Sequence, residues 1–161
     1  MAIYPIRTFG DPVLRQTAQP VTEFDADLEH LVEDMLESMY DAPGVGLAAP
    51  QIGISKRVFV YDIGEGPGAM INPEIVETSG TYEFDEGCLS VPGHFWPITR
   101  PEYARVAGFD VDGQAIELEG DELMGRMLQH EVDHLHGTLL IKRLERDLRI
   151  EFMREWRKAQ L

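Results

Sequence analysis

Two histidines lie four residues apart between Gln129 and His134, and a glutamate follows the first of them. Residues four apart share one face of an α-helix, so His130 and His134 can bind the same ion. Glu131 stands at the flank of that face, where its carboxylate can take a proton from metal-bound water. The spacing indicates a hydrolytic metal site, although such a pair of histidines also occurs in ordinary amphipathic helices.

A catalytic metal of this type needs a third protein ligand. One class of metalloproteases would place a histidine six residues after His134, but Leu140 occupies that position. A second class takes a glutamate from a following helix. The glutamates available for that role are Glu145, Glu151 and Glu155. Cys88, the only cysteine, is the stronger candidate because its surrounding glycines and proline indicate a bent strand end. A lone cysteine is nevertheless often only a small buried residue.

Two further motifs bear on this choice. The segment from Gly44 to Gln51 reads Gly-Val-Gly-Leu-Ala-Ala-Pro-Gln, and Cys88 lies within Glu-Gly-Cys-Leu-Ser. Together with His-Glu-Val-Asp-His they form three motifs in a fixed order. With these motifs and their spacing, the chain resembles the peptide deformylases over essentially its whole length. The resemblance implies a metal-dependent hydrolase that removes the N-terminal formyl group from N-formylmethionine of newly made polypeptides and releases formate.

The resemblance also implies a set of metal ligands: Cys88, His130 and His134, with water in the fourth position. A thiolate and two imidazoles leave one tetrahedral position open, and the metal lowers the pKa of the water bound there. Glu131 would act as the base and then protonate the leaving amine. The family commonly uses one Fe²⁺ ion, and the ligand types also admit Zn²⁺, Ni²⁺ or Co²⁺. Asp133 lies off the ligand face, where a supporting role is expected.

By the same resemblance, the oxyanion of the reaction would be stabilised by the side-chain amide of Gln51 and the backbone N–H of Leu89. The peptide would bind as an extended strand beside Gly46. The residues that match a pocket for the methionine side chain are Val45, Gly46, Leu89, Leu123 and Met127. Some members carry an arginine after the cysteine motif, whereas here the matching stretch is Gly93 to Trp96. His94 could contact the substrate, but an exposed loop residue is the favoured expectation.

Hydrophobic periodicity predicts the elements that position these residues. A helix is expected over residues 25–40, and the metal helix should run from a cap at Asp121 to Gly137. Strands are expected at 57–62, 70–77, 81–84, 102–111 and 114–119, the last two joined by an Asp112-Gly113 hairpin. We therefore expect a single α+β domain over residues 1–161, with largely antiparallel sheets cradling a central metal-binding helix and a C-terminal helix.

Composition narrows the function classes. A chain of 161 residues can bury a core without disulfides, and its single cysteine suits a reducing compartment. The formal charge of −15 argues against DNA binding. The sequence has neither an apolar run of membrane-spanning length nor a signal or transit peptide, so we expect a cytoplasmic protein without a membrane partner.

The C-terminal segment departs from the acidic average, because Lys142 to Leu161 holds seven basic and four acidic residues. One apolar stripe is expected on its helix: Leu144, Leu148, Phe152 and Trp156. Positive charge is expected on the solvent side: Arg143, Arg146, Arg149, Arg154, Arg157 and Lys158. This face either only solvates the helix or docks on the ribosome, as the family resemblance favours. N-formylmethionyl nascent peptides are the expected substrates, and intact catalytic motifs argue against a relative that only binds such chains.

Overall fold

The computed structural model describes residues 2–160, which contain three α-helices and seven β-strands. The helices are α1 (Ala26–Asp41), α2 (Glu122–Leu135) and α3 (Arg146–Ala159). The strands are β1 (Gly46–Ala48), β2 (Val58–Tyr61), β3 (Gly68–Ser79), β4 (Tyr82–Gly87), β5 (Phe95–Arg100), β6 (Tyr103–Phe109) and β7 (Ala115–Gly120). Short 3-10 helices are η1 (Pro12–Arg15), η2 (Ala49–Ile52) and η3 (Leu140–Arg143).

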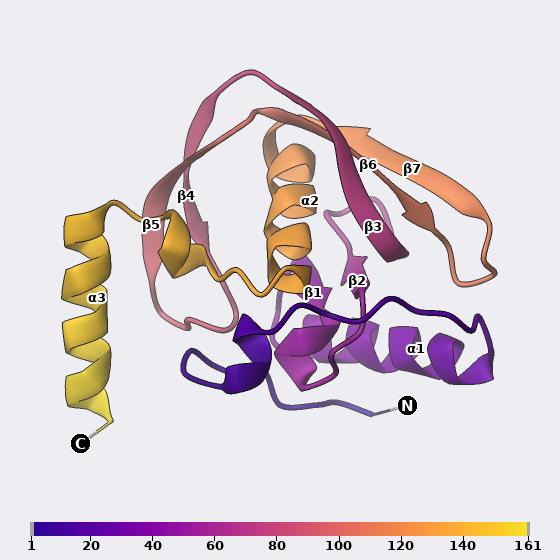
Figure 1. The fold of residues 1–161 in the computed structure, drawn as a ribbon, viewed down its shortest axis with the longest axis horizontal. Coiled ribbons are helices and arrows are strands. Elements are labelled where there is room, and N and C mark those ends of the chain that lie inside the picture. Colours follow the sequence, from indigo (N-terminus) through magenta and orange to yellow (C-terminus); the bar gives the residue numbers. More distant parts are fainter. Residues whose placement is uncertain (1, 161) are drawn as a thin grey trace.

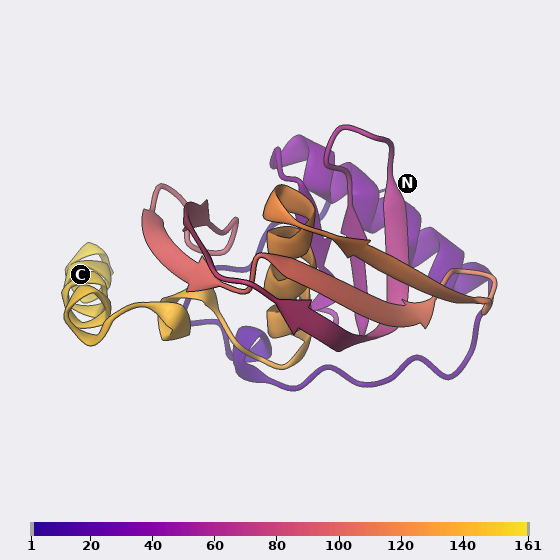
Figure 2. The same cartoon turned by 90° about the horizontal axis from the view of Figure 1, so that it is seen from above.

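The strands form two antiparallel sheets around α2. One sheet has the order β1-β2-β3-β6-β7, and the other consists of β4 and β5. Figure 1 shows α2 at the centre, with the β4–β5 hairpin on one side and the larger sheet on the other. The view from above in Figure 2 shows the same arrangement, with α1 covering the larger sheet and α3 beyond the hairpin. The predicted α+β fold with a cradled central helix is confirmed.

Helix α1 follows the predicted period closely. Its N-cap is Asp25, whose carboxylate accepts a hydrogen bond from the Leu28 N–H at 3.1 Å. The buried face of α1 packs on β1 and β2 through an apolar cluster. Its members from the helix are Leu28, Leu31, Val32, Met35 and Met39. This packing holds the chain that enters β1, where the first of the three motifs lies.

The predicted hairpin at Asp112-Gly113 is confirmed: Phe109 of β6 pairs with Ala115 of β7, and Gly113 has a φ of 84°. The other predicted strands correspond to β2, β3 and β4. Strands β1 and β5 were not predicted. Strand β1 has only three residues and does not show period-two alternation. Strand β5 contains Pro97, which a strand tolerates here because each strand of a two-stranded sheet has a free edge.

The metal-motif helix α2 begins and ends near the predicted residues. Asp121 occupies the N-cap position, but its side chain makes no capping hydrogen bond, so that part of the prediction is wrong. The first helical residue, Glu122, has a φ of 50°, which distorts the first turn and misaligns its N–H groups for capping. At the other end Gly137 has a φ of 76° and donates to the His134 carbonyl, as the predicted stop requires.

Helix α3 packs on the hairpin through an aromatic cluster. Phe152 is 2% exposed, and its ring centroid lies 5.3 Å from those of Phe9 and Trp96. The predicted apolar stripe is confirmed, although Leu144 lies just before the helix. His94 is half-buried and stacks on Trp96 at 5.3 Å, so the expectation of an exposed loop histidine is wrong. None of the helices in residues 2–160 is long and apolar enough to cross a membrane.

The packing of α3 predicts the effect of removing Phe152. We expect F152A to lower the free energy of unfolding by about 3–5 kcal/mol, because a large buried aromatic side chain is lost. Denaturant unfolding followed by circular dichroism measures the change. I150A is the matched control on the same helix, since Ile150 is 44% exposed, and its effect should stay within about 0.5 kcal/mol. Equal small losses for both variants would contradict the packing of α3.

Candidate metal centre and active site

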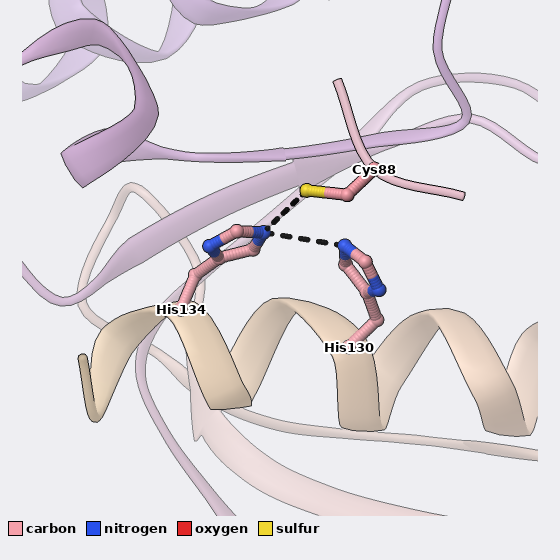
Figure 3. Close-up of side chains that lie close together, drawn as sticks. All are labelled: Cys88, His130 and His134. Carbon is pink, nitrogen blue, oxygen red and sulfur yellow. Dashed lines mark hydrogen bonds between the residues drawn. The ribbon is translucent and has the colours of Figure 1, made fainter. Parts of the chain in front are cut away.

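Cys88, His130 and His134 converge on one point of the structure. The Cys88 Sγ lies 3.4 Å from His134 Nε2, and the two histidine Nε2 atoms lie 3.2 Å apart. One candidate ligand atom from each residue falls within 4.8 Å of the others. Figure 3 shows both imidazoles rising from neighbouring turns of α2 toward the sulfur. The described residues therefore gather one sulfur and two nitrogen donors.

Two separate elements bring these donors together. Helix α2 carries both histidines, which its period places on one face. Cys88 follows β4 directly, and its carbonyl accepts a hydrogen bond from the Val91 N–H at 2.9 Å in a tight turn. The position of the β4–β5 hairpin against α2 therefore sets the distance between the sulfur and the imidazoles.

The donor set fits a divalent metal ion. Bond lengths of about 2.1 Å to nitrogen and about 2.3 Å to sulfur place tetrahedral ligands about 3.4–3.6 Å apart. The observed spacings of 3.2 Å and 3.4 Å are close to those values. Burial lowers the pKa of His134 well below its ordinary value, which favours the neutral imidazole that metals bind.

The carboxyl group of Glu131 lies next to this donor set in a dry environment. Its side chain is 3% exposed, and its Oε1 has no hydrogen-bond partner among residues 2–160. Burial raises the pKa of Glu131 to about 7. Its Oε2 would lie 2.6 Å from a Cβ atom added at Gly46, so glycine at that position leaves the room that the carboxylate occupies. A carboxyl group with this pKa can take up and release a proton near neutral pH.

Behind the histidines lies a buried ionic cluster centred on Glu86. Its carboxylate pairs with Arg100 through two hydrogen bonds of 2.7 and 2.9 Å, and Arg126 donates a third at 2.6 Å. Its Oε2 lies 2.8 Å from His130 Nδ1. Burial opposes the charge on Glu86, but hydrogen bonds from His130 and Arg100 outweigh it and hold the pKa well below its usual range. An ionised Glu86 accepts the Nδ1 proton of His130 and leaves Nε2 free for a metal.

The cluster continues through Asp133, which is on α2 but outside the donor set. Asp133 accepts hydrogen bonds from Arg100 at 2.9 Å and from Arg143 at 2.7 and 2.9 Å. Arg143 is exposed to solvent, as expected, but its charge is paired with the Asp133 carboxylate. The pairing arises because η3 turns the chain back toward α2 before α3 begins.

Gln51 lies beside the donor set and is 1% exposed. Its Oε1 accepts a hydrogen bond from the Ala48 N–H at 3.0 Å. This contact turns the amide nitrogen toward Ser90 Oγ at 3.1 Å and Cys88 Sγ at 3.8 Å. The 3-10 helix η2 thus holds an oriented N–H donor beside the candidate metal centre.

A cavity of about 600 Å³ opens onto this centre. Its lining includes the five residues predicted for the substrate pocket: Val45, Gly46, Leu89, Leu123 and Met127. Sequence reasoning missed Phe84 and Phe95, which are 48% and 70% exposed at the cavity, and also the lining residue Arg126. Its spacing of four residues before His130, on the face of the helix that carries the apolar residues, was the sequence signal that could have identified Arg126.

The C-terminal glutamates do not join the donor set. Glu145, Glu151 and Glu155 are exposed at the start of α3 or along it. Within residues 2–160, the cluster of possible metal ligands consists of Cys88 and the two histidines. The geometry therefore favours the cysteine over a tail glutamate as the third donor.

An α+β fold whose central helix presents two histidines and a buried glutamate, opposite a cysteine, defines the class of metal-dependent hydrolases. The sequence pattern of the polypeptide deformylase family matches residues 3–149. A peptide deformylase of Acidothermus cellulolyticus is 51% identical over 99% of this chain and 89% of its own length. One of Clostridium botulinum is 51% identical over 89% of this chain and 97% of its own length.

Solved structures agree with these relatives. The crystal structure of a peptide deformylase from Legionella pneumophila has a TM-score of 0.92 at 42% identity and covers 99% of this chain and 98% of its own. That of Ehrlichia chaffeensis in complex with actinonin has a TM-score of 0.94 at 36% identity, with the same coverage. The chain belongs to the polypeptide deformylase family. It is a hydrolase that removes the N-formyl group from new polypeptides.

The Glu86 contact with His130 predicts that E86Q weakens metal binding. An amide has no negative charge to hold the Nδ1 proton of His130, and such supporting contacts are typically worth about 10–100-fold in metal affinity. Chelator competition on folded protein measures the dissociation constant. E83Q is the matched control, because Glu83 is exposed on the same strand. Equal affinities for E86Q and E83Q would contradict the role of Glu86.

Proposed function

We propose that this chain releases formate from the N-formylmethionyl ends of nascent polypeptides, with its divalent metal held by Cys88, His130 and His134. The observation that carries the proposal is the convergence of one sulfur and two imidazole nitrogens beside the buried Glu131. When bound there, the metal supplies a Lewis acid that acidifies the attacking water and polarises the formyl carbonyl.

Glu131 is the general base and acid of the proposed reaction. It takes one proton from the attacking water as the new C–O bond forms at the formyl carbon. It then gives that proton to the amine nitrogen as the C–N bond breaks, so that formic acid and a free amino terminus leave, and the acid ionises to formate in water. The pKa of about 7 that burial gives Glu131 suits both transfers.

The proposed oxyanion donors are the Gln51 amide and the Leu89 backbone N–H. As the carbonyl carbon becomes tetrahedral, its oxygen gains negative charge that an oriented N–H stabilises. The hydrogen bond from Ala48 to Gln51 Oε1 supports this role, because it keeps the amide nitrogen on the side of the donor set. Leu89 follows Cys88 in the chain and lines the same cavity.

We assign the substrate's methionine side chain to the apolar wall of the cavity. The wall consists of Val45, Gly46, Leu89, Leu123 and Met127. Strand β1 is an edge strand of the larger sheet, so the backbone at Gly46 can pair with an extended peptide. A formyl group carries hydrogen where an acetyl group carries methyl, and a tight site accepts the smaller group.

The proposed location of the reaction is the cytoplasm, where new polypeptides are made, with α3 docking on the ribosome. Four basic residues of α3 border one shallow groove with Ile150 and Met153. They are Arg149, Arg154, Arg157 and Lys158. The apolar stripe of α3 faces the hairpin. The basic groove therefore remains available to bind a partner of opposite charge, such as ribosomal RNA.

The proposed base predicts that E131Q retains its metal but loses nearly all turnover, because an amide cannot accept the water proton. Formate release measures activity, and elemental analysis measures metal content. E122Q is the matched control on the same helix, since Glu122 is exposed and lies outside the donor set; it should keep wild-type activity. A metal-loaded E131Q with activity near that of the wild type would eliminate Glu131 as the base.

Fe²⁺ is the metal that we propose for the enzyme in the cell. A thiolate bound to ferrous iron is open to oxidation, so iron-loaded protein should lose activity in air faster than nickel- or zinc-loaded protein. The measurement is activity over time for each metal form, after elemental analysis of anaerobically purified protein. Equal rates for all metals would mean that the thiolate site is not the vulnerable point. Anaerobic protein containing only zinc would contradict the iron assignment.

The basic groove predicts salt-sensitive binding to ribosomes. We expect R154E/R157E to weaken co-sedimentation at low salt without unfolding the protein, because both side chains are exposed and the apolar stripe is kept. R15E/K56E makes the same charge change at exposed residues of the body and should bind more tightly than R154E/R157E. Identical co-sedimentation of the two double variants would leave α3 with a structural role only.

A further inference from the structure

Arg126 is a charged residue in an almost fully buried position, at 4% exposure. It precedes His130 by four residues on α2, so the two side chains leave the same face of the helix. The proposed reaction uses no proton or charge of Arg126. Burying a guanidinium costs free energy unless the group is paired.

The contacts of Arg126 reach both strands of the β4–β5 hairpin. One terminal nitrogen donates to Glu86 Oε1 on β4 at 2.6 Å. The other donates to the backbone carbonyls of Tyr82 on β4 at 3.3 Å and Ile98 on β5 at 3.2 Å. The guanidinium carbon also lies 5.1 Å from the centre of the Tyr82 ring. One side chain of α2 is thereby fixed to the backbone and a carboxylate of the hairpin.

This attachment lies between the two sources of metal donors. The hairpin ends in Cys88, and α2 carries His130 and His134. Glu86 accepts from Arg126 on one oxygen and contacts His130 on the other, at 2.6 and 2.8 Å. A shift of the hairpin relative to α2 would therefore move the Cys88 sulfur away from the two histidines and disturb the contact between Glu86 and His130.

We propose that Arg126 is a positioning residue for the metal centre. It acts through Glu86 and the hairpin carbonyls to hold the Cys88 sulfur at bonding distance from a metal on His130 and His134. The inference rests on the proposed ligand set. In this arrangement a residue outside the ligand set fixes the geometry of the ligands.

The test uses Co²⁺ added to metal-free full-length protein. We expect R126M to raise the Co²⁺ dissociation constant about 10–100-fold and to weaken the thiolate-to-cobalt absorption band, because the sulfur moves away. R126K keeps the charge but not the forked donors, so it should fall between R126M and the wild type. R105M is the matched control, since Arg105 pairs with Glu77 and Glu117 at the surface; it should match the wild type.

Combining R126M with E86Q tests whether Arg126 affects metal affinity through Glu86. If Arg126 acts through Glu86, the double variant should lose less affinity than the two single losses combined. Fully additive losses would overturn the route through Glu86. Unchanged cobalt affinity and absorption in R126M would overturn the proposal, and R126Q carries the same test if R126M does not fold.

C88A separates this proposal from the ligand assignment. It should abolish the thiolate band whatever Arg126 does, because the sulfur itself is gone. Retention of wild-type affinity and absorption by C88A would refute the ligand set, and with it the positioning role. Loss of the band in C88A with a wild-type spectrum in R126M would refute the positioning role alone.

Discussion

The carboxylate of Glu86 is the contact on which the other parts of the site depend. It pairs with Arg100 through two hydrogen bonds, with Arg126 through one, and with the His130 imidazole through another. These partners come from β5 and from two turns of α2, while Glu86 itself lies on β4. One side chain thus joins the hairpin to the helix and also sets which nitrogen of His130 faces the sulfur.

Ion pairs and hydrogen bonds within this cluster offset the free-energy cost of burying its charges. Removing a carboxylate from water is expensive, and a buried ion pair recovers the cost only when its geometry is good and its hydrogen bonds are filled. Glu86 meets that condition, and Arg100 carries the network on to Asp133, which pairs with Arg143. The network therefore runs from the metal centre to η3, just before α3. Fully paired buried networks of this kind rigidify a structure and favour one arrangement, while their net contribution to stability is often small.

Local pattern carried the prediction of the helices and turns, whereas the ligand set of Cys88, His130 and His134 was predicted from the family resemblance. The period of α1, the Asp112-Gly113 turn and the stop at Gly137 are short-range signals, and the structure confirms them. The spacing of His130 and His134 anticipated a shared helix face for the same reason. The Glu86 network was out of reach because its contacts join residues 14 to 44 positions apart. Strand β5 was missed because Pro97 argues against a strand unless the sheet is known to have free edges.

The separation of the donors along the chain also orders events during synthesis of the protein itself. Cys88 precedes His134 by 46 residues. At a translation rate of about 5–20 residues per second, the chain needs roughly 2–9 s to extend from one to the other. Until both His130 and His134 have been translated, the cysteine lacks the complete donor set. Metal acquisition by the complete donor set therefore follows translation of α2, and the thiol is open to oxidants before any ion can cover it.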